Sequence, residues 1–249
     1  MELRGSVVMI TGGAIRVGRQ IALHMARQGA GILFTYLPGE PWEEAQAQIA
    51  ACGVDALAQP MDARDTSQIW AAVAAGLAHF GRIDVLINSA SVWLKAPFLE
   101  ITEAQWDNAL DINLKGPFFL AQAVAAAMLR QGGGVIINIT DISAFQPWEG
   151  YAPHGASKAG LVSLTKSLAV ELAPTVRVNA IAPGTVETPS RAAYFNANPE
   201  FRERMLKRIP VGRFATPEEI GAAAVYLASP AASYITGQTL TLDGGLTAA

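Results

Sequence analysis

The feature that most constrains this chain is the regular alternation of short apolar runs with longer alanine-rich segments. The apolar runs lie at 7–11, 32–36, 85–89, 135–140, 176–182 and 239–243, with a weaker one at 55–62. They are nearly continuous in apolar residues, as strands that are covered on both faces must be. Between them, segments such as 18–29 and 160–173 show helical spacing, and one face of the second collects Leu161, Leu164, Leu168 and Leu172.

This alternation predicts a doubly wound α/β fold, in which a mostly parallel sheet of about seven strands carries helices on both faces. No internal repeat, linker or low-complexity tail interrupts the pattern, so we predict one Rossmann-type domain over residues 1–249. With 51% apolar residues, the chain can bury a large core without metals or disulfides. The least regular stretch, 185–219, follows a strand end. We expect it to form a lid over a site at the carboxyl edge of the sheet, the alternative being a solvated excursion.

Charge and cysteine content narrow the classes of partner. The net charge is −3 and the 18 lysines and arginines are scattered, which argues against nucleic acid or an anionic membrane as a partner. Cys52 is the single cysteine, and no Cys/His cluster has the spacing of a metal site. The apolar run at 7–10 is too short for a signal peptide, and the uncharged stretch 220–242 contains Pro230 and Gly237. We therefore expect a soluble protein of the cytoplasm that acts on a small molecule.

A glycine-rich turn follows the first predicted strand, in the sequence "VVMITGGAIRVGRQIA". Gly12 and Gly13 relieve steric limits in the turn, and Gly18 lets the following helix approach the sheet closely. The amides at the start of that helix then favour the negative charge of a pyrophosphate. The position directly after the first strand of an α/β pattern therefore predicts a dinucleotide site.

The second predicted strand bears on which dinucleotide binds. NAD sites commonly place an acidic residue at its end, to hold the adenosine ribose. The stretch 31–39 contains no such residue, whereas Arg16 in the glycine-rich turn could meet a 2′-phosphate, with Thr35 and Tyr36 nearby. We therefore favour NADP over NAD, the alternative being that Arg16 is simply solvated.

The turn, together with "NSA" at 88–90, "HGASK" at 154–158, "APG" at 182–184 and the C-terminal stretch ending in "YITGQTLTLDGG", resembles the short-chain dehydrogenase/reductase family. The resemblance covers essentially the whole chain and implies an NAD(P)-dependent oxidoreductase that forms dimers or tetramers. The apolar stretch 116–129 would suit such an interface or a core helix. The cofactor contacts implied by the resemblance are Thr11, Gly12, Ile15, Arg16, Gly18, Asp62, Asn88, Ser89, Ala90, Lys158, Pro183, Gly184, Val186 and Thr188.

Two of the four catalytic positions implied by the resemblance depart from the family pattern, which is an Asn, a Ser, a Tyr and a Lys. Asn113 matches the Asn, which positions a water linked to the Lys. Lys158 matches the Lys, which binds the nicotinamide ribose and lowers the pKa of the Tyr. Asp141 occupies the Ser position, and His154 occupies the Tyr position.

The first departure resembles the pteridine reductases and dihydromonapterin reductases. They share an Arg in the turn (Arg16), an Asp at the Ser position (Asp141) and an aromatic residue shortly after "NSAS" (Trp93). In that subgroup the aromatic ring stacks on the pterin and the Asp helps to deliver protons. Trp93 and Tyr151 would then line a substrate pocket; the alternatives are a loop Trp that packs on the lid and a core Tyr.

The second departure leaves three hypotheses. Histidine has an ordinary pKa of ~6.5 and titrates in a useful range, but its ring nitrogen ends roughly 2 Å short of a tyrosine hydroxyl. In the first hypothesis, Asp141 and His154 handle protons, directly or through water, in the reduction of a carbonyl or a pterin-like C=N. In the second, the protein binds the cofactor with little redox activity, as a sensor or assembly partner. In the third, His154 merely begins a helix and Tyr151 supplies the proton. The intact Asn113, Lys158 and glycine-rich turn favour a cofactor-dependent activity over pure binding.

Overall fold

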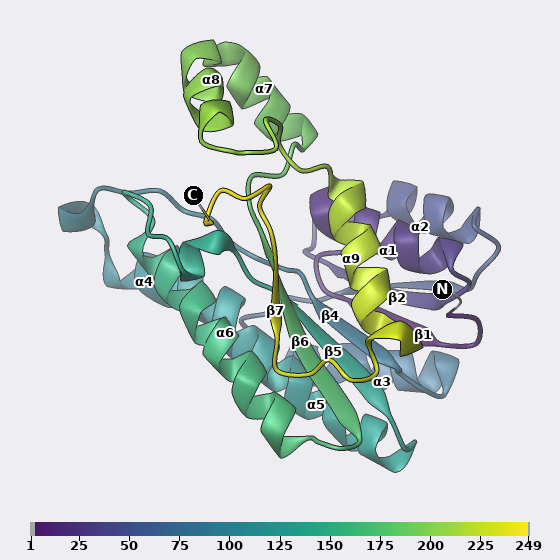
Figure 1. The fold of residues 1–249 in the computed structure, drawn as a ribbon. Coiled ribbons are helices and arrows are strands. Elements are labelled where there is room, and N and C mark those ends of the chain that lie inside the picture. Colours follow the sequence, from purple (N-terminus) through teal and green to yellow (C-terminus); the bar gives the residue numbers. More distant parts are fainter. Residues whose placement is uncertain (1–2, 249) are drawn as a thin grey trace.

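Seven strands lie side by side in one sheet, in the order β3-β2-β1-β4-β5-β6-β7, in the computed structural model of residues 3–248 (Figure 1). Every pair of neighbouring strands is parallel. The strands are β1 (Val7–Ile10), β2 (Gly31–Tyr36), β3 (Ala56–Pro60), β4 (Val85–Asn88), β5 (Gly134–Ile139), β6 (Val176–Pro183) and β7 (Thr239–Leu242). The predicted doubly wound fold is confirmed, and each strand ends within two residues of the predicted apolar run.

Helices cover both faces of this sheet, as the continuous apolar strands require. They are α1 (Arg16–Arg27), α2 (Glu43–Ala50), α3 (Thr66–Phe80), α4 (Glu103–Leu110), α5 (Gly116–Arg130), α6 (Ala152–Glu171), α7 (Pro189–Ala197), α8 (Pro199–Lys207) and α9 (Pro217–Ala228). On one face the side chains of α1, α2 and α9 pack in one apolar cluster, and on the other those of α3 and α5 pack in a second. Successive strand residues alternate between the two clusters, so that Val8 and Ile10 face one layer and Met9 the other.

The strand order reverses at β1, because the chain adds β2 and β3 on one side and then returns to place β4 on the other. The connections that leave the carboxyl ends of β1 and β4 therefore diverge and open a crevice at the edge of the sheet. Ligands of open α/β sheets bind at such a switch point. The glycine-rich turn at Thr11–Gly18 and the stretch after Asn88 both lie there.

The stretch 185–219, predicted to be the least regular, is largely helical. It contains α7 and α8, and in Figure 1 these two helices project beyond the carboxyl edge of the sheet. Pro189 and Pro199 occupy the first turns of the two helices, where proline is well tolerated, and the Thr188 side chain caps α7. The prolines that make the stretch look irregular in the sequence therefore begin helices in the structure.

The α7–α8 unit has an apolar cluster of its own. Phe195, Met205, Ile209 and Phe214 are buried against one another, and the Phe195 and Phe214 rings stack with centroids 4.5 Å apart. The buried residues that join this cluster from the rest of the domain are Ile142, which follows β5, and Leu246, near the C-terminus. Trp148 from the domain, and Phe201 and Leu206 of α8, pack against it while partly buried.

One helical stretch, Glu103–Arg130, is long and apolar enough to cross a membrane by length and composition alone. A π-helical turn at Asp111–Lys115 interrupts it, and 56% of its most apolar window is buried inside the domain. Core helices of globular proteins pass the same criterion, so this is a weak indication of a membrane span.

Candidate active site

A cavity of about 640 Å³ runs along the carboxyl edge of the sheet. Its walls come from the ends of β1, β2, β4, β5 and β6, from the start of α6 and from α7. The predicted site residues that line it are Gly12, Ile15, Arg16, Gly18, Asp62, Ser89, Ala90, Trp93, Asp141, Tyr151, His154, Lys158, Pro183, Gly184, Val186 and Thr188. The glycine-rich turn forms one end, and His154 and Trp93 lie at the other.

The backbone of the glycine-rich turn has no room for side chains at two positions. Gly12 has a φ of +64°, and a Cβ there would lie 3.1 Å from the Cα of Ala90. A Cβ on Gly18 would collide with the carbonyl oxygen of Gly12. The start of α1 therefore comes as close to the strand end as a backbone can. This shape fits the pyrophosphate of a dinucleotide, since it exposes main-chain amides at a helix start.

Two residues expected to contact the cofactor lie behind the cavity wall instead. The Thr11 hydroxyl accepts hydrogen bonds from the backbone N–H groups of Ser89 and Ala90, both at 3.0 Å. The Asn88 side chain donates to Asn138 Oδ1 at 2.8 Å on the neighbouring strand. Thr11 and Asn88 thus tie adjacent strand ends together and position the wall that a cofactor would meet.

Charged side chains gather at the glycine-rich end of the cavity. The Arg64 guanidinium binds the Asp62 carboxylate, with its shortest contact at 2.6 Å, and this hydrogen bonding lowers the pKa of Asp62 below its ordinary value. The Arg16 side chain makes no hydrogen bond or ion pair with any residue of the described part of the chain, 3–248. Sequence reasoning missed Glu40, which lies one residue beyond the stretch inspected for acids and accepts a hydrogen bond from the Leu37 N–H at 2.9 Å.

The hydroxyl and carbonyl oxygens of Thr35 accept hydrogen bonds from the glycine-rich turn. Its hydroxyl accepts a long hydrogen bond from the Gly12 N–H at 3.4 Å, and its carbonyl accepts one from the Gly13 N–H at 3.0 Å. Tyr36 stacks on Trp42 with ring centroids 5.3 Å apart. Of the polar groups expected around a 2′-phosphate, Arg16 is therefore the charged one that lines the cavity without a partner among residues 3–248.

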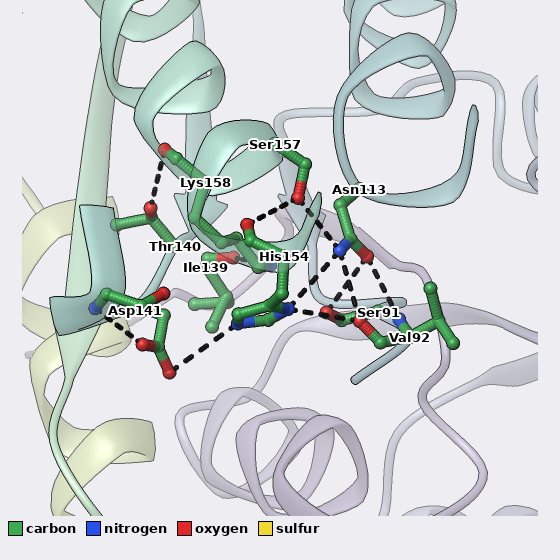
Figure 2. Close-up of polar contacts among 10 residues, drawn as sticks. Ser91, Val92, Asn113, Ile139, Thr140, Asp141, His154, Ser157 and Lys158 are labelled. Carbon is green, nitrogen blue, oxygen red and sulfur yellow. Dashed lines mark hydrogen bonds and ion pairs between the residues drawn. The ribbon is translucent and has the colours of Figure 1, made fainter. Parts of the chain in front are cut away.

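Asn113 organises the catalytic end of the cavity without lining it (Figure 2). It lies in the π-helical turn Asp111–Lys115, and its side chain is fully buried. The amide oxygen accepts from the Val92 N–H at 2.9 Å and the Ser91 hydroxyl at 3.0 Å, and the amide nitrogen donates to the Val92 carbonyl at 3.1 Å and the Ser157 hydroxyl at 3.0 Å. These four contacts use its hydrogen-bonding capacity. Its side chain positions the loop after β4 rather than pointing toward Lys158.

His154 is held in the first turn of α6 with one ring nitrogen committed and the other free. Nδ1 lies 3.1 Å from the Val92 carbonyl oxygen, which can only accept, and 3.5 Å from Asn113 Nδ2, whose hydrogens are donated to Val92 and Ser157. The neutral ring therefore carries its proton on Nδ1. Nε2 is buried and makes no hydrogen bond with any residue of 3–248; it lies 4.0 Å from Asp141 Oδ2, as Figure 2 shows. The side chain is only 5% exposed. The unpaired nitrogen therefore faces the Asp141 side of the cavity.

Asp141 and Lys158 complete the polar group around His154. Burial raises the pKa of the Asp141 carboxyl, but the nearby His154 ring and the Ser143 N–H, which donates at 2.7 Å, together hold that pKa below its ordinary value. Asp141 is therefore a carboxylate at neutral pH. Burial lowers the pKa of Lys158 from 10.5 to about 8, against the opposing charge of Asp141. The Lys158 ammonium donates to the Ile139 carbonyl at 2.9 Å.

Aromatic rings and one unexpected arginine form the outer part of this end. Trp93 and Tyr151 stack with centroids 5.0 Å apart, and the Trp93 ring lies 6.0 Å from the imidazole of His154. The guanidinium carbon of Arg191, on α7, lies 4.2 Å from the Trp93 centroid. Burial raises the pKa of Tyr151, which makes it a weaker acid than an ordinary tyrosine and a poor substitute proton donor. Sequence reasoning did not single out Arg191.

Comparison with known proteins supplies the family. Residues 13–247 match the protein family described as enoyl-(acyl carrier protein) reductase. The chain is 37% identical to a 3-oxoacyl-(acyl-carrier-protein) reductase of Thermotoga maritima over 99% of both chains. The chain belongs to the short-chain dehydrogenase/reductase family. It is also 40% identical to D-threitol dehydrogenase of Mycolicibacterium smegmatis, over 99% of this chain and 94% of that one.

A solved structure agrees with this assignment to the short-chain dehydrogenase/reductase family. A gluconate 5-dehydrogenase from Burkholderia cenocepacia, in complex with NADP and tartrate, has a TM-score of 0.93 to this chain at 33% identity, covering 100% of this chain and 97% of that one. The predicted Rossmann-type fold and the predicted NAD(P)-dependent oxidoreductase class are thereby confirmed. The relatives named here are not pteridine reductases, so the finer resemblance to that subgroup stays a prediction.

The described residues 3–248 contain no group of three or more His, Cys, Asp or Glu side chains that could hold a metal ion. The cavity brings together the titratable side chains of Asp141, His154 and Lys158 and the glycine-rich turn.

Proposed function

We propose that this protein transfers hydride between NADP(H) and a carbonyl or hydroxyl carbon of a small molecule, with His154 handling the proton. The observation that carries the proposal is the free, buried Nε2 of His154. It lies on the wall of a cavity that continues to the glycine-rich turn, and the opposite ring nitrogen is fixed by a backbone carbonyl.

NADP is the cofactor that the residues at the glycine-rich end support. When bound, it supplies or accepts the hydride at its nicotinamide ring. The turn at Gly12 and Gly18 has the shape for the pyrophosphate, and the unpaired Arg16 guanidinium can meet a 2′-phosphate. Ser89, Ala90, Pro183, Gly184, Val186 and Thr188 would line the rest of its path, with Lys158 at the nicotinamide ribose. The Glu40 carboxylate accepts a hydrogen bond from the Leu37 N–H of its own loop.

The fixed tautomer of His154 determines which proton it can move in each direction. In the neutral ring, Nε2 carries a lone pair and can accept the proton of a substrate hydroxyl, which is the requirement of alcohol oxidation. In the reverse direction, the protonated ring donates from Nε2 to the developing alkoxide. The Asp141 carboxylate, 4.0 Å away, compensates the positive charge that the ring then carries. Asn113 acts through Val92, because it fixes the carbonyl that orients the ring.

A pterin-like C=N substrate is the second candidate, favoured by one specific observation. Trp93 lines the cavity next to Asp141 and His154, as the resemblance to pteridine reductases implies. A flat heterocycle would have to share the indole with Tyr151 and Arg191, which both contact it here. The carbonyl or hydroxyl substrate needs no such displacement and is the one that we put first.

We further propose that the α7–α8 unit acts as a lid within 185–219, and that the protein is a cytoplasmic homo-oligomer, a dimer or tetramer. Support for the lid is its position over the cavity, to which Thr188 and Arg191 contribute wall. Support for the oligomer is the exposure of apolar side chains in the segment just before α4, where Leu99 is 93% and Phe98 is 77% exposed.

The test is a comparison of wild type with His154→Gln and His154→Tyr. NADPH binding is measured by fluorescence titration, and rates are measured on a panel of carbonyl compounds, alcohols and dihydropterins. Because Gln cannot relay a proton from the Nε2 position, we expect a loss of about 10²–10⁴ in kcat for His154→Gln with NADPH affinity unchanged. His24→Gln is the matched control, since His24 binds its own helix through the Gln20 carbonyl.

Three results would count against the proposal. Wild-type rates in His154→Gln would remove His154 from proton transfer. Activity that appears only in His154→Tyr would mean that the natural protein binds the cofactor without using it in redox chemistry. Failure of wild type to bind either NADPH or NADH would remove the cofactor assignment itself.

A further inference from the structure

A guanidinium without an acidic partner lines the substrate end of the cavity. Arg191 is the third residue of α7, and its backbone N–H donates to the Thr188 hydroxyl that caps the helix. Its side chain makes no hydrogen bond or ion pair with any described residue of 3–248. Burial lowers the pKa of Arg191, which reflects the cost of removing this charge from water. It nevertheless remains a cation at neutral pH.

The surroundings of Arg191 compensate its charge only in part. The faces of Trp93 and Phe195 lie 4.2 Å and 5.5 Å from its guanidinium carbon, and such cation–π contacts use the plane of the group. The N–H donors at the edge of the guanidinium stay unused. The charged and titratable groups that face it from neighbouring elements are Asp141, Tyr151 and Tyr194. Of these only Asp141 is anionic at neutral pH, and it lies beyond ion-pair distance.

Arg191 and the proton-handling group line one cavity and flank the same indole ring. The guanidinium carbon lies 4.2 Å, and the imidazole centroid of His154 lies 6.0 Å, from the same indole centroid of Trp93. A compact molecule can therefore reach both, with one functional group at His154 Nε2 and another at the guanidinium edge. An edge with paired N–H donors suits a carboxylate or phosphate, which it can bind through two parallel hydrogen bonds.

We propose that Arg191 is the anion-recognition residue of this active site, and that the substrate is a small hydroxy or oxo compound carrying a carboxylate or phosphate group. The anionic group binds the Arg191 guanidinium while the reacting carbon lies next to His154. This inference rests on the function proposed above, in which the same cavity holds the reacting carbon. It also gives α7 a role in substrate specificity, since Arg191 on this helix would bind the anionic group of the substrate.

The experiment uses succinate, inorganic phosphate and neutral succinamide as probes, titrated calorimetrically into the NADP-saturated full-length protein. Succinate and succinamide differ in charge but little in size, so their affinity ratio isolates anion recognition. We expect wild type to prefer succinate over succinamide by about tenfold or more, and Arg191→Gln to lose that preference. Arg202→Gln is the matched control, because Arg202 lies on α8 and faces Glu187 at 3.8 Å. The phosphate titration distinguishes the two anion classes.

Equal affinities for succinate, phosphate and succinamide in wild type would overturn the inference, as would an anion preference that survives in Arg191→Gln. NADPH affinity, measured separately, distinguishes this failure from that of the proposed function. Arg191 lies at the opposite end of the cavity from the glycine-rich turn, so Arg191→Gln should bind NADPH as wild type does. If wild type shows Arg191-dependent anion binding but no NADPH binding, the cofactor assignment fails and the anion site stands.

Discussion

Replacement of Lys158 by methionine should make this protein more stable while removing one of the proposed site residues. Lys158 is only 3% exposed, its ammonium donates to the Ile139 carbonyl, and burial lowers the pKa of Lys158 from 10.5 to about 8. A difference of this size between the unfolded and folded pKa corresponds to about 3 kcal/mol of unfavourable free energy while the folded protein keeps the charge. Methionine fills a similar volume without a charge, but it leaves the Ile139 carbonyl without this donor, at a cost of about 1 kcal/mol. We therefore expect a net gain of about 2 kcal/mol at pH 7.

The dependence on pH separates this explanation from simple packing effects. The folded pKa of Lys158 lies below its unfolded value, so below pH 8 both states are protonated and the penalty is constant. Between pH 8 and pH 10.5 the unfolded chain still binds the proton that the folded protein has lost, and the stability of wild type rises with pH. Lys158→Met lacks this rise. The advantage of the variant should therefore be largest at pH 7 and should disappear toward pH 10.

Urea denaturation of the cofactor-free protein at several pH values between 7 and 10 measures the effect directly. In a thermal unfolding scan at pH 7, the Tm of Lys158→Met should exceed that of wild type by roughly 4–8 °C for a chain of this size. Lys166→Met is the control, because Lys166 lies exposed on the same helix and should leave both the stability and its pH dependence nearly unchanged. A difference between wild type and Lys158→Met that stays the same from pH 7 to pH 10 would refute the reasoning, since the burial of the charge could not then be its source.

Two further changes test the ends of the cavity. Arg16→Ala should weaken NADPH binding by about tenfold or more and leave NADH binding nearly unchanged, because the guanidinium meets the 2′-phosphate alone; fluorescence titration with both nucleotides checks this, and an equal loss for the two would contradict the assignment. Trp93→Ala should raise the KM for a dihydropterin if the pterin-like substrate is accepted, since it removes the indole face beside His154; an unchanged KM in steady-state assays would take Trp93 out of the substrate pocket.

The sheet and the neighbourhood of the catalytic residues can be predicted from the sequence because they depend on coarse properties. A strand covered on both faces must be largely apolar, as β1 is throughout and β5 is except at Asn138, and the carboxyl ends of parallel strands must share one edge. Residues that follow those ends, such as Asp141 and Ser89, are therefore brought to one crevice whatever the details of packing. The resemblance to a family in this region adds the role of each residue.

The direction in which a polar side chain points is not encoded in the same way. Thr11 directly follows β1 and Asn88 ends β4, next to Ser89, yet the side chains of both turn toward neighbouring strands. They do so because a buried polar group needs a hydrogen-bond partner. Arg191 is one of several arginines in 185–219, and only the packing of α7 over Trp93 separates it from the others. The helices of that stretch are also hard to predict, since they are short and begin at prolines.

The apolar cluster inside the α7–α8 unit has a consequence for how such a protein can diversify. Phe195, Met205, Ile209 and Phe214 support one another and touch the sheet domain through Ile142 and Leu246, so most substitutions in these helices leave the large core intact. Substitutions in α7 and α8 can therefore change the side chain presented to a substrate without altering the proposed site residues at the carboxyl edge of the sheet. Grafting the corresponding two helices from a relative, with those two contact residues preserved, is accordingly a practical route to new specificity.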